Sequence, residues 1–317
     1  MANAGKGAEA LDASKARRPR VFTSTERTAG LEELWERGLP SGDKTGWPSV
    51  DKHYTVVPGQ LTILTGWPGA GKSEWLDALL VNLARQGWRT AIFSPENQPV
   101  DLHIAKLLEK LSGKPFGMGP TARMSLDEVR EFNDDLGQWF AFIDPPQEDG
   151  LTAWEVIEAA QPYLSQFEIG SKRGLVIDPW NELEHWRPKE LTETEYVSQT
   201  LSRVRNWARK QSVHVWIVAH PAKMRREDGK LPIPKPDMIA GSQHWWNKAD
   251  CAITVWRDFE KIDARLVQIH VQKIRFKNVG RPGVIELDYD RVTGRYSEPK
   301  RQPELVAQDY RSARSGD

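Results

Sequence analysis

Four residues, Gly66, Gly71, Lys72 and Ser73, have the spacing G-x-x-x-x-G-K-[ST] of a phosphate-binding loop. Glycines let backbone N–H groups close around a phosphate, and a helix that starts there adds the positive end of its dipole. An apolar run at 60–66 precedes the loop and leucines at helical spacing follow it, as such a site requires. Lys72 would reach the β- and γ-phosphates and Ser73 would hold Mg²⁺; the alternative is an ordinary glycine-rich turn.

Two acidic residues follow other apolar runs. Asp178 ends the run at 174–178, and the carboxyl end of a parallel strand is where open α/β sheets bind ligands. This is a Walker B arrangement, which places a carboxylate near Mg²⁺. Glu96 follows the run at 89–94 and could polarise an attacking water. The alternatives are a helix N-cap for Asp178 and an exposed loop position for Glu96.

A histidine and a basic segment come next in the chain. His220 ends the apolar run at 213–220 and could sense the γ-phosphate, or it is a satisfied core or loop histidine. Residues 221–236 contain four prolines and a glycine, which exclude a long helix, so we predict a loop. Basic loops contact nucleic-acid phosphates, although a merely solvated loop fits as well. Its five cations, against two acids, are Lys223, Arg225, Arg226, Lys230 and Lys235.

Two further cations lie on a predicted strand at 266–276. Lys273 and Arg275 alternate with Ile274 and Phe276, so both cations face one side of the strand. Since this strand is remote in sequence from the phosphate-binding loop, the pair could serve as a finger that reaches a neighbouring subunit's γ-phosphate. A salt-bridged surface is the alternative.

Strands and helices alternate through most of the chain, which predicts an α/β fold. The βαβ pattern favours a mostly parallel sheet flanked by helices. The last three predicted strands have no helix between them and indicate a C-terminal meander that extends the sheet. The predicted strands are 60–66, 89–94, 141–144, 174–178, 213–220, 251–257, 266–276 and 283–290.

Composition restricts the class of protein. The 317 residues fit one large or two small domains, and the single cysteine, Cys251, excludes an intrachain disulfide. Because the formal net charge is zero, a nucleic-acid site must be a local patch. No apolar stretch approaches the roughly 20 residues that span a membrane, and the N-terminus has no secretory h-region. We predict disordered tails at 1–25 and 299–317 and an amphipathic helix within 26–40 that docks on a partner surface.

Taken together, the order and content of these segments resemble the helicase domain of the DnaB-like hexameric replicative helicases. The likeness is to Twinkle-type mitochondrial helicases and to the helicase half of phage primase-helicases, and it covers about residues 40–298. It is carried by TGWPSVDKHYTVVPGQLTILTGWPGAGKS, FSPEN, LVIDPWNEL, IVAHPAK, GSQHWWNKADCAITVWRD and KIRFKNVGRPGVIELDYD. The resemblance implies a RecA-like P-loop core over 41–298.

The resemblance also implies roles for individual residues. Lys72 and Ser73, with the loop glycines Gly66, Gly69 and Gly71, would bind the phosphates and Mg²⁺, and Asp178 would be the Walker B acid. Glu96 matches the catalytic base, His220 the γ-phosphate sensor and Arg275 the trans finger, with Lys273 beside it. Arg257 and Tyr289 match residues that sandwich the nucleotide base. The DNA-binding segments would be formed by Lys223, Arg225, Arg226, Lys230, Gly241 and Ser242.

The implied function is an NTP-driven, ring-shaped DNA helicase that translocates on single-stranded DNA and unwinds duplex in replication. It implies ATP and Mg²⁺, a hexameric ring, possible primase or polymerase partners, and a cytoplasmic phage or bacterial setting. The alternatives are a RecA-like recombination or repair ATPase, a DNA-binding or loader module without unwinding, and, as the weakest rival, a small-molecule kinase. At most about 40 residues precede the matched region, so the primase-like module of such relatives is either absent or missing from a fragment, and priming activity is not among our predictions.

Overall fold

The computed structural model describes residues 21–145, 150–222, 231–240, 243–258 and 265–299. The chain divides into two compact units, Met1–Pro40 and Ser41–Asp317, which are described separately. Among the described residues, no helix is both long and apolar enough to cross a membrane.

The first unit contains η1 (Thr25–Arg27) and α2 (Thr28–Arg37), so the predicted amphipathic helix is present and begins earlier than the apolar positions indicated. The apolar side chains of α2, namely Leu31, Leu34 and Trp35, are all exposed, and Trp35 is 87% exposed. No residue of α2 is buried within this chain. The helix therefore has an apolar face that its own unit does not cover.

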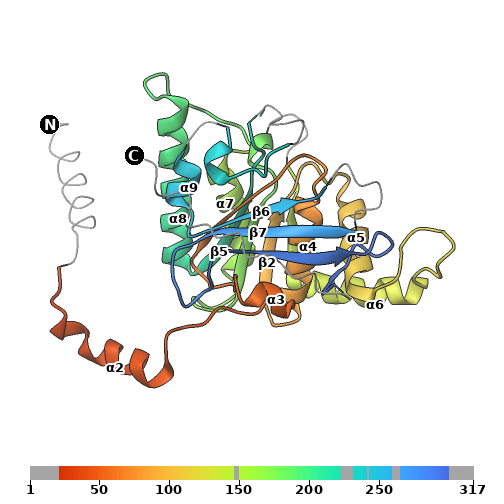
Figure 1. Cartoon of the computed structure of the whole chain (residues 1–317), viewed down its shortest axis with the longest axis horizontal. Coiled ribbons are helices and arrows are strands. Elements are labelled where there is room, and N and C mark those ends of the chain that lie inside the picture. Colours follow the sequence, from red (N-terminus) through yellow and green to blue (C-terminus); the bar gives the residue numbers. More distant parts are fainter. Residues whose placement is uncertain (1–20, 146–149, 223–230, 241–242, 259–264, 300–317) are drawn as a thin grey trace, which may run out of the picture. The chain divides into compact units, whose positions relative to one another are not determined.

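The second unit is built on a nine-stranded sheet with the order β3-β2-β4-β5-β1-β6-β7-β8-β9 (Figure 1). All neighbours from β3 to β6 pair in parallel, and β6 to β9 pair antiparallel. The strands are β1 (Leu61–Thr65), β2 (Arg89–Phe93), β3 (Phe140–Ile143), β4 (Arg173–Ile177), β5 (Val213–Val218), β6 (Cys251–Trp256), β7 (Leu266–Ile274), β8 (Gly283–Tyr289) and β9 (Tyr296–Ser297).

This sheet confirms the predicted α/β fold with a mostly parallel sheet and a C-terminal meander. One detail differs, because β6 pairs in parallel with β1 and so belongs to the parallel part; only β7 and the strands after it run antiparallel to their neighbours. The short strand β9 was not predicted, since two residues are too few to carry a periodic pattern.

Helices cover both faces of the sheet, as the burial of its strands requires. Alternate residues of β1 point to opposite faces: Leu64 packs in a core with α4, α5 and α6, while Leu61 and Ile63 pack with α7, α8 and α9. The helices are α3 (Pro48–Asp51), α4 (Lys72–Ala84), α5 (Val100–Ser112), α6 (Leu126–Trp139), α7 (Ala153–Leu164), η2 (Trp180–Glu182), α8 (Glu193–Gln211), η3 (Pro236–Met238) and α9 (His244–Lys248).

Local sequence sets where three of these helices begin. Ser125 and Glu128 form a capping box at the start of α6, in which each side chain satisfies a backbone N–H of the other residue. Thr152 starts α7 and Thr192 starts α8 with the same motif. The cap of α8 matters for the site, because it ends the long connection that follows β4.

Candidate nucleotide-binding site

The glycine-rich loop joins β1 to α4, and its backbone demands glycine at two points. Gly66 has φ 150° and a Cβ there would lie 2.3 Å from the carbonyl oxygen of Val255, so no other side chain fits. Gly71 has φ 90°, in the left-handed region, and stands directly before the first turn of α4. The loop thus presents the amino end of a 13-residue helix, a ready anion site.

Lys72 is buried at the start of α4, and its Nζ donates to the carbonyl oxygen of Trp67 at 3.3 Å. Burial lowers the pKa of Lys72, and the negative charges of Asp178 and Glu96 offset part of that effect. The ammonium is therefore held inside the loop by a neutral carbonyl, which a phosphate oxygen could replace as its acceptor.

Asp178 lies directly after β4, where its backbone N–H donates to the carbonyl oxygen of Phe93 at 2.9 Å. Burial raises the pKa of the carboxyl to about 6, although a hydrogen bond with the Ser73 hydroxyl opposes this. The two groups predicted to hold Mg²⁺ thus contact each other across the loop. Among the described residues, no cluster of three or more His, Cys, Asp or Glu could hold a metal by itself. A Mg²⁺ ion here would share Ser73, Asp178 and nucleotide phosphates, the mixed ligand set that Mg²⁺ commonly takes.

The raised pKa of Asp178 predicts that its ionised carboxylate lowers the free energy of unfolding. Its folded pKa of about 6 exceeds the ordinary 3.8, so the folded state holds the proton more tightly than the unfolded state. Stability is therefore lost as pH rises from 3.8 to 6, and the loss is complete above pH 6. We expect Asp178→Asn to raise the free energy of unfolding at pH 8 by about 1–3 kcal/mol, and by less at pH 5, measured by denaturant unfolding without Mg²⁺ or nucleotide.

Asp77 on α4 supplies the control of opposite sign. Burial alone would raise the pKa of Asp77, but His103, whose Nε2 lies 3.1 Å from Asp77 Oδ1, acts together with Lys110 and Lys106 to lower it below the ordinary value. Asp77→Asn should therefore lower the free energy of unfolding at pH 8. If both substitutions were destabilising by similar amounts, the charge argument for Asp178 would be wrong.

Glu96 and His220 meet at the same edge of the sheet. Glu96 follows β2 and His220 follows β5, and Glu96 Oε1 lies 3.6 Å from His220 Nε2. Burial lowers the pKa of His220, the positive charge of Lys72 lowers it further, and Glu96 raises it in part. The structure therefore brings together Lys72, Asp178, Glu96 and His220 from the carboxyl ends of four parallel strands.

Sequence reasoning missed Asn181, which ties two of these segments together. Its Oδ1 accepts the backbone N–H of His220 at 2.9 Å, although the two residues are 39 positions apart. The available signal was its place three residues after Asp178, in the loop at the carboxyl end of β4. Asn181 links the histidine that could sense a phosphate to the loop that carries the Walker B acid.

Arg257 and Tyr289 lie together at this same edge. The Arg257 guanidinium is 5.0 Å from the centre of the Tyr289 ring, and the two residues follow or end β6 and β8, which both have their carboxyl ends here. Tyr296, another residue that sequence reasoning missed, packs 5.0 Å from Tyr289 and donates its hydroxyl to the Gly71 carbonyl at 3.4 Å. A planar base near the loop would meet a cation and an aromatic ring.

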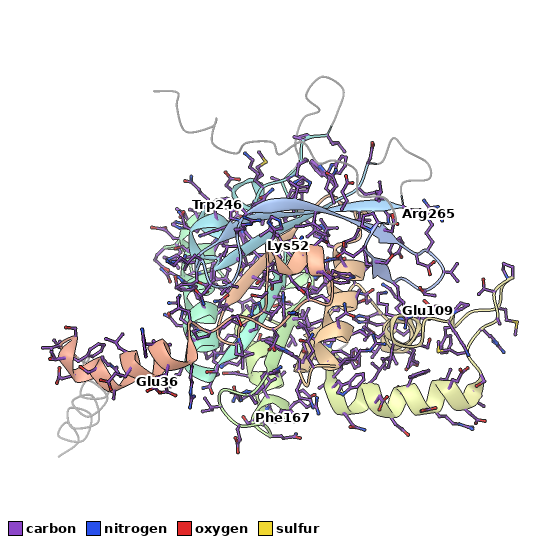
Figure 2. The ribbon with its side chains drawn as sticks, turned by 60° about the horizontal axis from the view of Figure 1, so that its bottom comes forward. Glu36, Lys52, Glu109, Phe167, Trp246 and Arg265 are labelled. Carbon is purple, nitrogen blue, oxygen red and sulfur yellow. The ribbon has the colours of Figure 1, made fainter. Side chains whose placement is uncertain are left out.

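Lys273 and Arg275 lie at the opposite edge of the sheet. The end of β7 pairs with the start of β6, so these cations are at the amino ends of the parallel strands. Figure 2 shows Trp246, beside this end of β7, and Arg265 at the other end. Both cations point the same way, because each donates to the Asn247 carbonyl oxygen. The distance is 3.5 Å from Lys273 Nζ and 2.9 Å from an Arg275 guanidinium nitrogen. Arg275 lies one residue beyond β7 and not within it.

Asp250 organises this opposite edge. Its carboxylate is fully buried, accepts the Leu61 N–H, and pairs with Arg205 at 2.6 Å, Arg275 at 3.0 Å and Arg209 at 3.3 Å. A strand of five residues is about 17 Å long, so Arg275 is remote from the phosphate-binding loop of its own chain. Within one chain these cations cannot take part in the site that Lys72 forms.

The residues predicted to bind DNA, Lys223, Arg225, Arg226, Lys230, Gly241 and Ser242, lie outside the described residues. The described residues on either side of these segments, 221–222 and 231–240, form hydrogen bonds with one another and with the phosphate-binding loop. Ala222 N donates to the Met238 carbonyl at 2.8 Å, and Pro221 forms a bridge with Ile239. Trp67, within the phosphate-binding loop, donates its indole N–H to the Pro232 carbonyl at 2.9 Å. The 231–240 segment is therefore connected directly to the phosphate-binding loop.

The chain is similar to a curated protein, the chloroplastic/mitochondrial Twinkle homolog of Arabidopsis thaliana, with 43% sequence identity over 268 residues. The match covers 82% of this chain and 37% of that protein, so the chain spans well under half of its relative. No family model matches the sequence.

Solved structures share the fold at low sequence identity. A solved ATPase domain superposes with a TM-score of 0.74 at 16% identity, covering 89% of this chain and all of that one. A DnaB-like replicative helicase, described with its interactions with primase, gives a TM-score of 0.69 at 14% identity and covers 86% of this chain and 67% of the other. The RadB recombinase gives 0.52 at 14% identity, over 81% and 99% of the two chains. The sequence match and the shared fold together show that this chain contains a RecA-like α/β domain that is similar to part of a Twinkle homolog and to the ATPase domains of DnaB-like helicases.

Proposed function

We propose that this domain hydrolyses a nucleoside triphosphate, ATP in the first instance, and uses the energy to move along single-stranded DNA as part of a ring-shaped replicative helicase. The observation that supports this most is the convergence of Lys72, Asp178, Glu96 and His220 at one sheet edge, in a domain of the DnaB-like type. The resemblance to phage primase-helicases supports a phage or bacterial replication setting, with a primase or polymerase as partner.

The chemistry assigned to this chain follows from the positions of its groups. Lys72 and the loop backbone bind phosphate oxygens, and Ser73 and Asp178 hold Mg²⁺, which would neutralise charge on the β- and γ-phosphates. Glu96 orients and deprotonates the attacking water. His220, in contact with Glu96 and bonded to Asn181, responds to the γ-phosphate and begins the segment assigned to DNA. Arg257 and Tyr289 hold the base.

Among the described residues, Lys273 and Arg275 lie at the far edge of the sheet and do not reach the phosphate-binding loop of their own chain. We assign the missing positive charge to Arg275 of a neighbouring subunit, as in a ring where each ATP site lies between two copies. The exposed face of α2, formed by Leu31, Leu34 and Trp35, supports the same assembly, since the 26–40 segment would dock on a neighbour.

The basic segment that follows His220 is assigned to the phosphates of single-stranded DNA. Lys223→Ala combined with Arg226→Ala is expected to weaken DNA binding for every sequence alike and to lower the slope of log K against log salt by about 1.4, since each lost contact to a single strand contributes about 0.7. Fluorescence anisotropy with a labelled oligonucleotide at several salt concentrations measures this. Lys189→Ala combined with Lys210→Ala removes the same charge elsewhere and is the control. An unchanged slope in the first variant would exclude the segment as the DNA contact.

The decisive test of the whole proposal is the ATPase rate as a function of protein concentration, with and without single-stranded DNA. A site shared between subunits predicts a specific activity that rises with protein concentration, and a DNA-driven motor predicts a further rise with DNA. Unwinding of a forked duplex separates a helicase from a loader module. A specific activity that depends on neither protein concentration nor DNA would contradict the proposal.

A second candidate function is a RecA-like recombinase, which the likeness to the RadB fold favours. Recombinases assemble as open filaments and a helicase of this type forms closed rings. Electron microscopy in ATP and single-stranded DNA discriminates between them, and filaments would favour the recombinase.

A further inference from the structure

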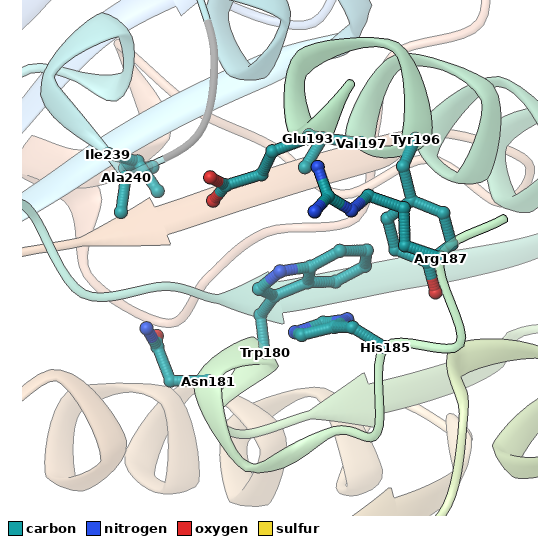
Figure 3. A pocket seen from close by; sticks show the side chains of 9 residues that line it. All are labelled: Trp180, Asn181, His185, Arg187, Glu193, Tyr196, Val197, Ile239 and Ala240. Carbon is teal, nitrogen blue, oxygen red and sulfur yellow. The ribbon is translucent and has the colours of Figure 1, made fainter. Parts of the chain in front are cut away.

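The loop that connects β4 to α8 lines a cavity together with other segments. None of the residue roles proposed above involves this cavity. Its volume is about 340 Å³, and Figure 3 shows the side chains that line it. The lining comes from the loop, from the first turn of α8 and from the segment before the second predicted DNA contact. The lining residues are Trp180, Asn181, His185, Arg187, Glu193, Tyr196, Val197, Ile239 and Ala240.

Aromatic rings form one wall and the floor of this cavity. Trp180 is 5% exposed and is fixed from behind by Trp245, whose ring lies 5.0 Å away and perpendicular to it. His185 lies 5.0 Å from Trp180 at an interplanar angle of 32°, and Tyr196 lies 5.8 Å from His185. Trp180 is therefore part of the packed core, and the exposed ring of His185 is the flat π face that a planar ligand can reach.

The polar groups around these rings are mixed in character. Arg187 supplies N–H donors, Glu193 supplies carboxylate acceptors, and the Asn181 amide supplies both. Figure 3 shows these three side chains around the cavity that Trp180 lines. A phosphate would be repelled by Glu193, and a purely apolar ligand would displace water from Arg187 and Glu193 without replacing the lost hydrogen bonds. A ligand with a flat ring and with donors and acceptors on its edge, which is the description of a nucleobase, satisfies both requirements.

The position of the cavity also favours a base that belongs to a nucleic-acid strand. Asn181 accepts the backbone N–H of His220, which begins the basic segment. Ile239, in the wall, is bridged to Pro221, and Ala240 directly precedes Gly241 and Ser242. Both segments assigned to DNA therefore begin next to the cavity. The neighbouring Trp186 is 74% exposed and directly precedes Arg187, and exposed aromatic residues beside cations are typical of surfaces that stack single-stranded bases.

We propose that this cavity binds one nucleobase of the single strand, stacked on the exposed ring of His185 and hydrogen-bonded at its edge by Arg187, Glu193 and Asn181. This inference rests on the proposed DNA binding and adds a base contact to a function otherwise assigned to phosphates. Because Asn181 also holds His220, an occupied cavity lies one hydrogen bond away from the γ-phosphate sensor.

The test compares a DNA oligonucleotide with one in which several neighbouring nucleotides are abasic but keep their phosphates. Stacking of one base contributes about 1–3 kcal/mol, so the full chain with a non-hydrolysable ATP analogue should bind the intact strand about 5- to 150-fold more tightly than the abasic strand. His185→Ala and Glu193→Gln should each lower this ratio severalfold, with an unchanged salt slope. Trp180 is left intact, because its burial makes it part of the fold.

Lys189→Ala is the matched control, since Lys189 lies on the same connecting loop but not in the cavity wall. It should leave the ratio of intact to abasic affinity as in wild type. Glu193→Gln also discriminates between ligands, because removing a carboxylate would strengthen binding of both strands if the cavity held a phosphate. Stronger binding of both strands by Glu193→Gln would overturn the inference. A ratio of intact to abasic affinity that stays at the wild-type value in both cavity variants would overturn it as well, and would leave a protein partner as the occupant. If wild type bound neither strand, the proposed function itself would fail.

Discussion

Arg275→Ala is expected to lower the turnover number for DNA-stimulated ATP hydrolysis by about 10³- to 10⁵-fold, the range that an arginine finger contributes. The physical reason is that the guanidinium would neutralise charge that develops on the γ-phosphate in the transition state. Nucleotide binding by each chain should persist, because Arg275 lies at the far edge of the sheet from its own phosphate-binding loop. Steady-state ATPase rates at saturating protein and DNA measure the effect.

The control for this substitution is Arg209→Ala. Both arginines pair with the buried carboxylate of Asp250, Arg275 at 3.0 Å and Arg209 at 3.3 Å, and Arg205 remains in either variant to keep that charge compensated. Arg209→Ala therefore reproduces the structural loss without removing the proposed finger. Similar ATPase rates in the two variants would mean that Arg275 acts only through Asp250.

Mixed assemblies test whether the finger acts between subunits. Lys72→Ala chains keep Arg275, and Arg275→Ala chains keep Lys72. Where an Arg275→Ala chain supplies the phosphate-binding loop and a Lys72→Ala chain supplies the finger, the interface between them contains a complete site. We expect the mixture to hydrolyse ATP faster than either variant alone. Absence of any recovery, with mixed assembly shown by mass spectrometry, would exclude a site shared in this way.

Glu96→Gln is expected to lower the turnover number by about 10²- to 10⁴-fold, the usual contribution of a positioned general base. Glutamine keeps the size of the side chain and its contact with His220 but cannot accept a proton from water. ATP affinity should change little, since the phosphates are bound by the loop and Lys72. Turnover and equilibrium binding of a fluorescent ATP analogue, measured on the same preparation, separate the two effects.

Glu182→Gln is the matched control for the base. Glu182 lies in η2 and also raises the pKa of His220, whereas the acids that raise the pKa of Lys72 are Asp178 and Glu96. Its loss should leave turnover within a fewfold of wild type. An equal loss in both variants would mean that the carboxylates act by tuning His220, and a wild-type rate for Glu96→Gln would exclude Glu96 as the base.

Much of the fold could be predicted from sequence because the signals are local. Buried strands appear as short apolar runs, and the loop needs glycine because Gly66 lies against Val255 and Gly71 has a positive φ. The meander was predicted from the absence of helical spacing between its strands. Its attachment was not, since parallel pairing of β6 with β1 depends on which strands become neighbours, and no local pattern encodes that.

In the candidate site, too, the sequence predicts the positions of single residues along the chain but not the contacts between them. Lys72, Ser73, Asp178, Glu96 and His220 each end or follow an apolar run, so the sequence alone determined that polar groups stand at the carboxyl ends of these strands. Their mutual contacts, such as Glu96 with His220, arise only when the strand order places β2, β4, β5 and β1 side by side.

Tertiary structure alone decided the links that span long stretches of chain. Asn181 bonds His220, Tyr296 bonds Gly71 and Trp67 bonds Pro232, over separations from 39 to 225 residues. It also decided that Arg275 lies at the sheet edge opposite Lys72, because an antiparallel strand carries its carboxyl end to where its parallel neighbours begin. Residue type and spacing placed polar groups at the ends of the strands, and the direction of β7 decided that Arg275 and Lys72 of one chain lie at opposite edges of the sheet.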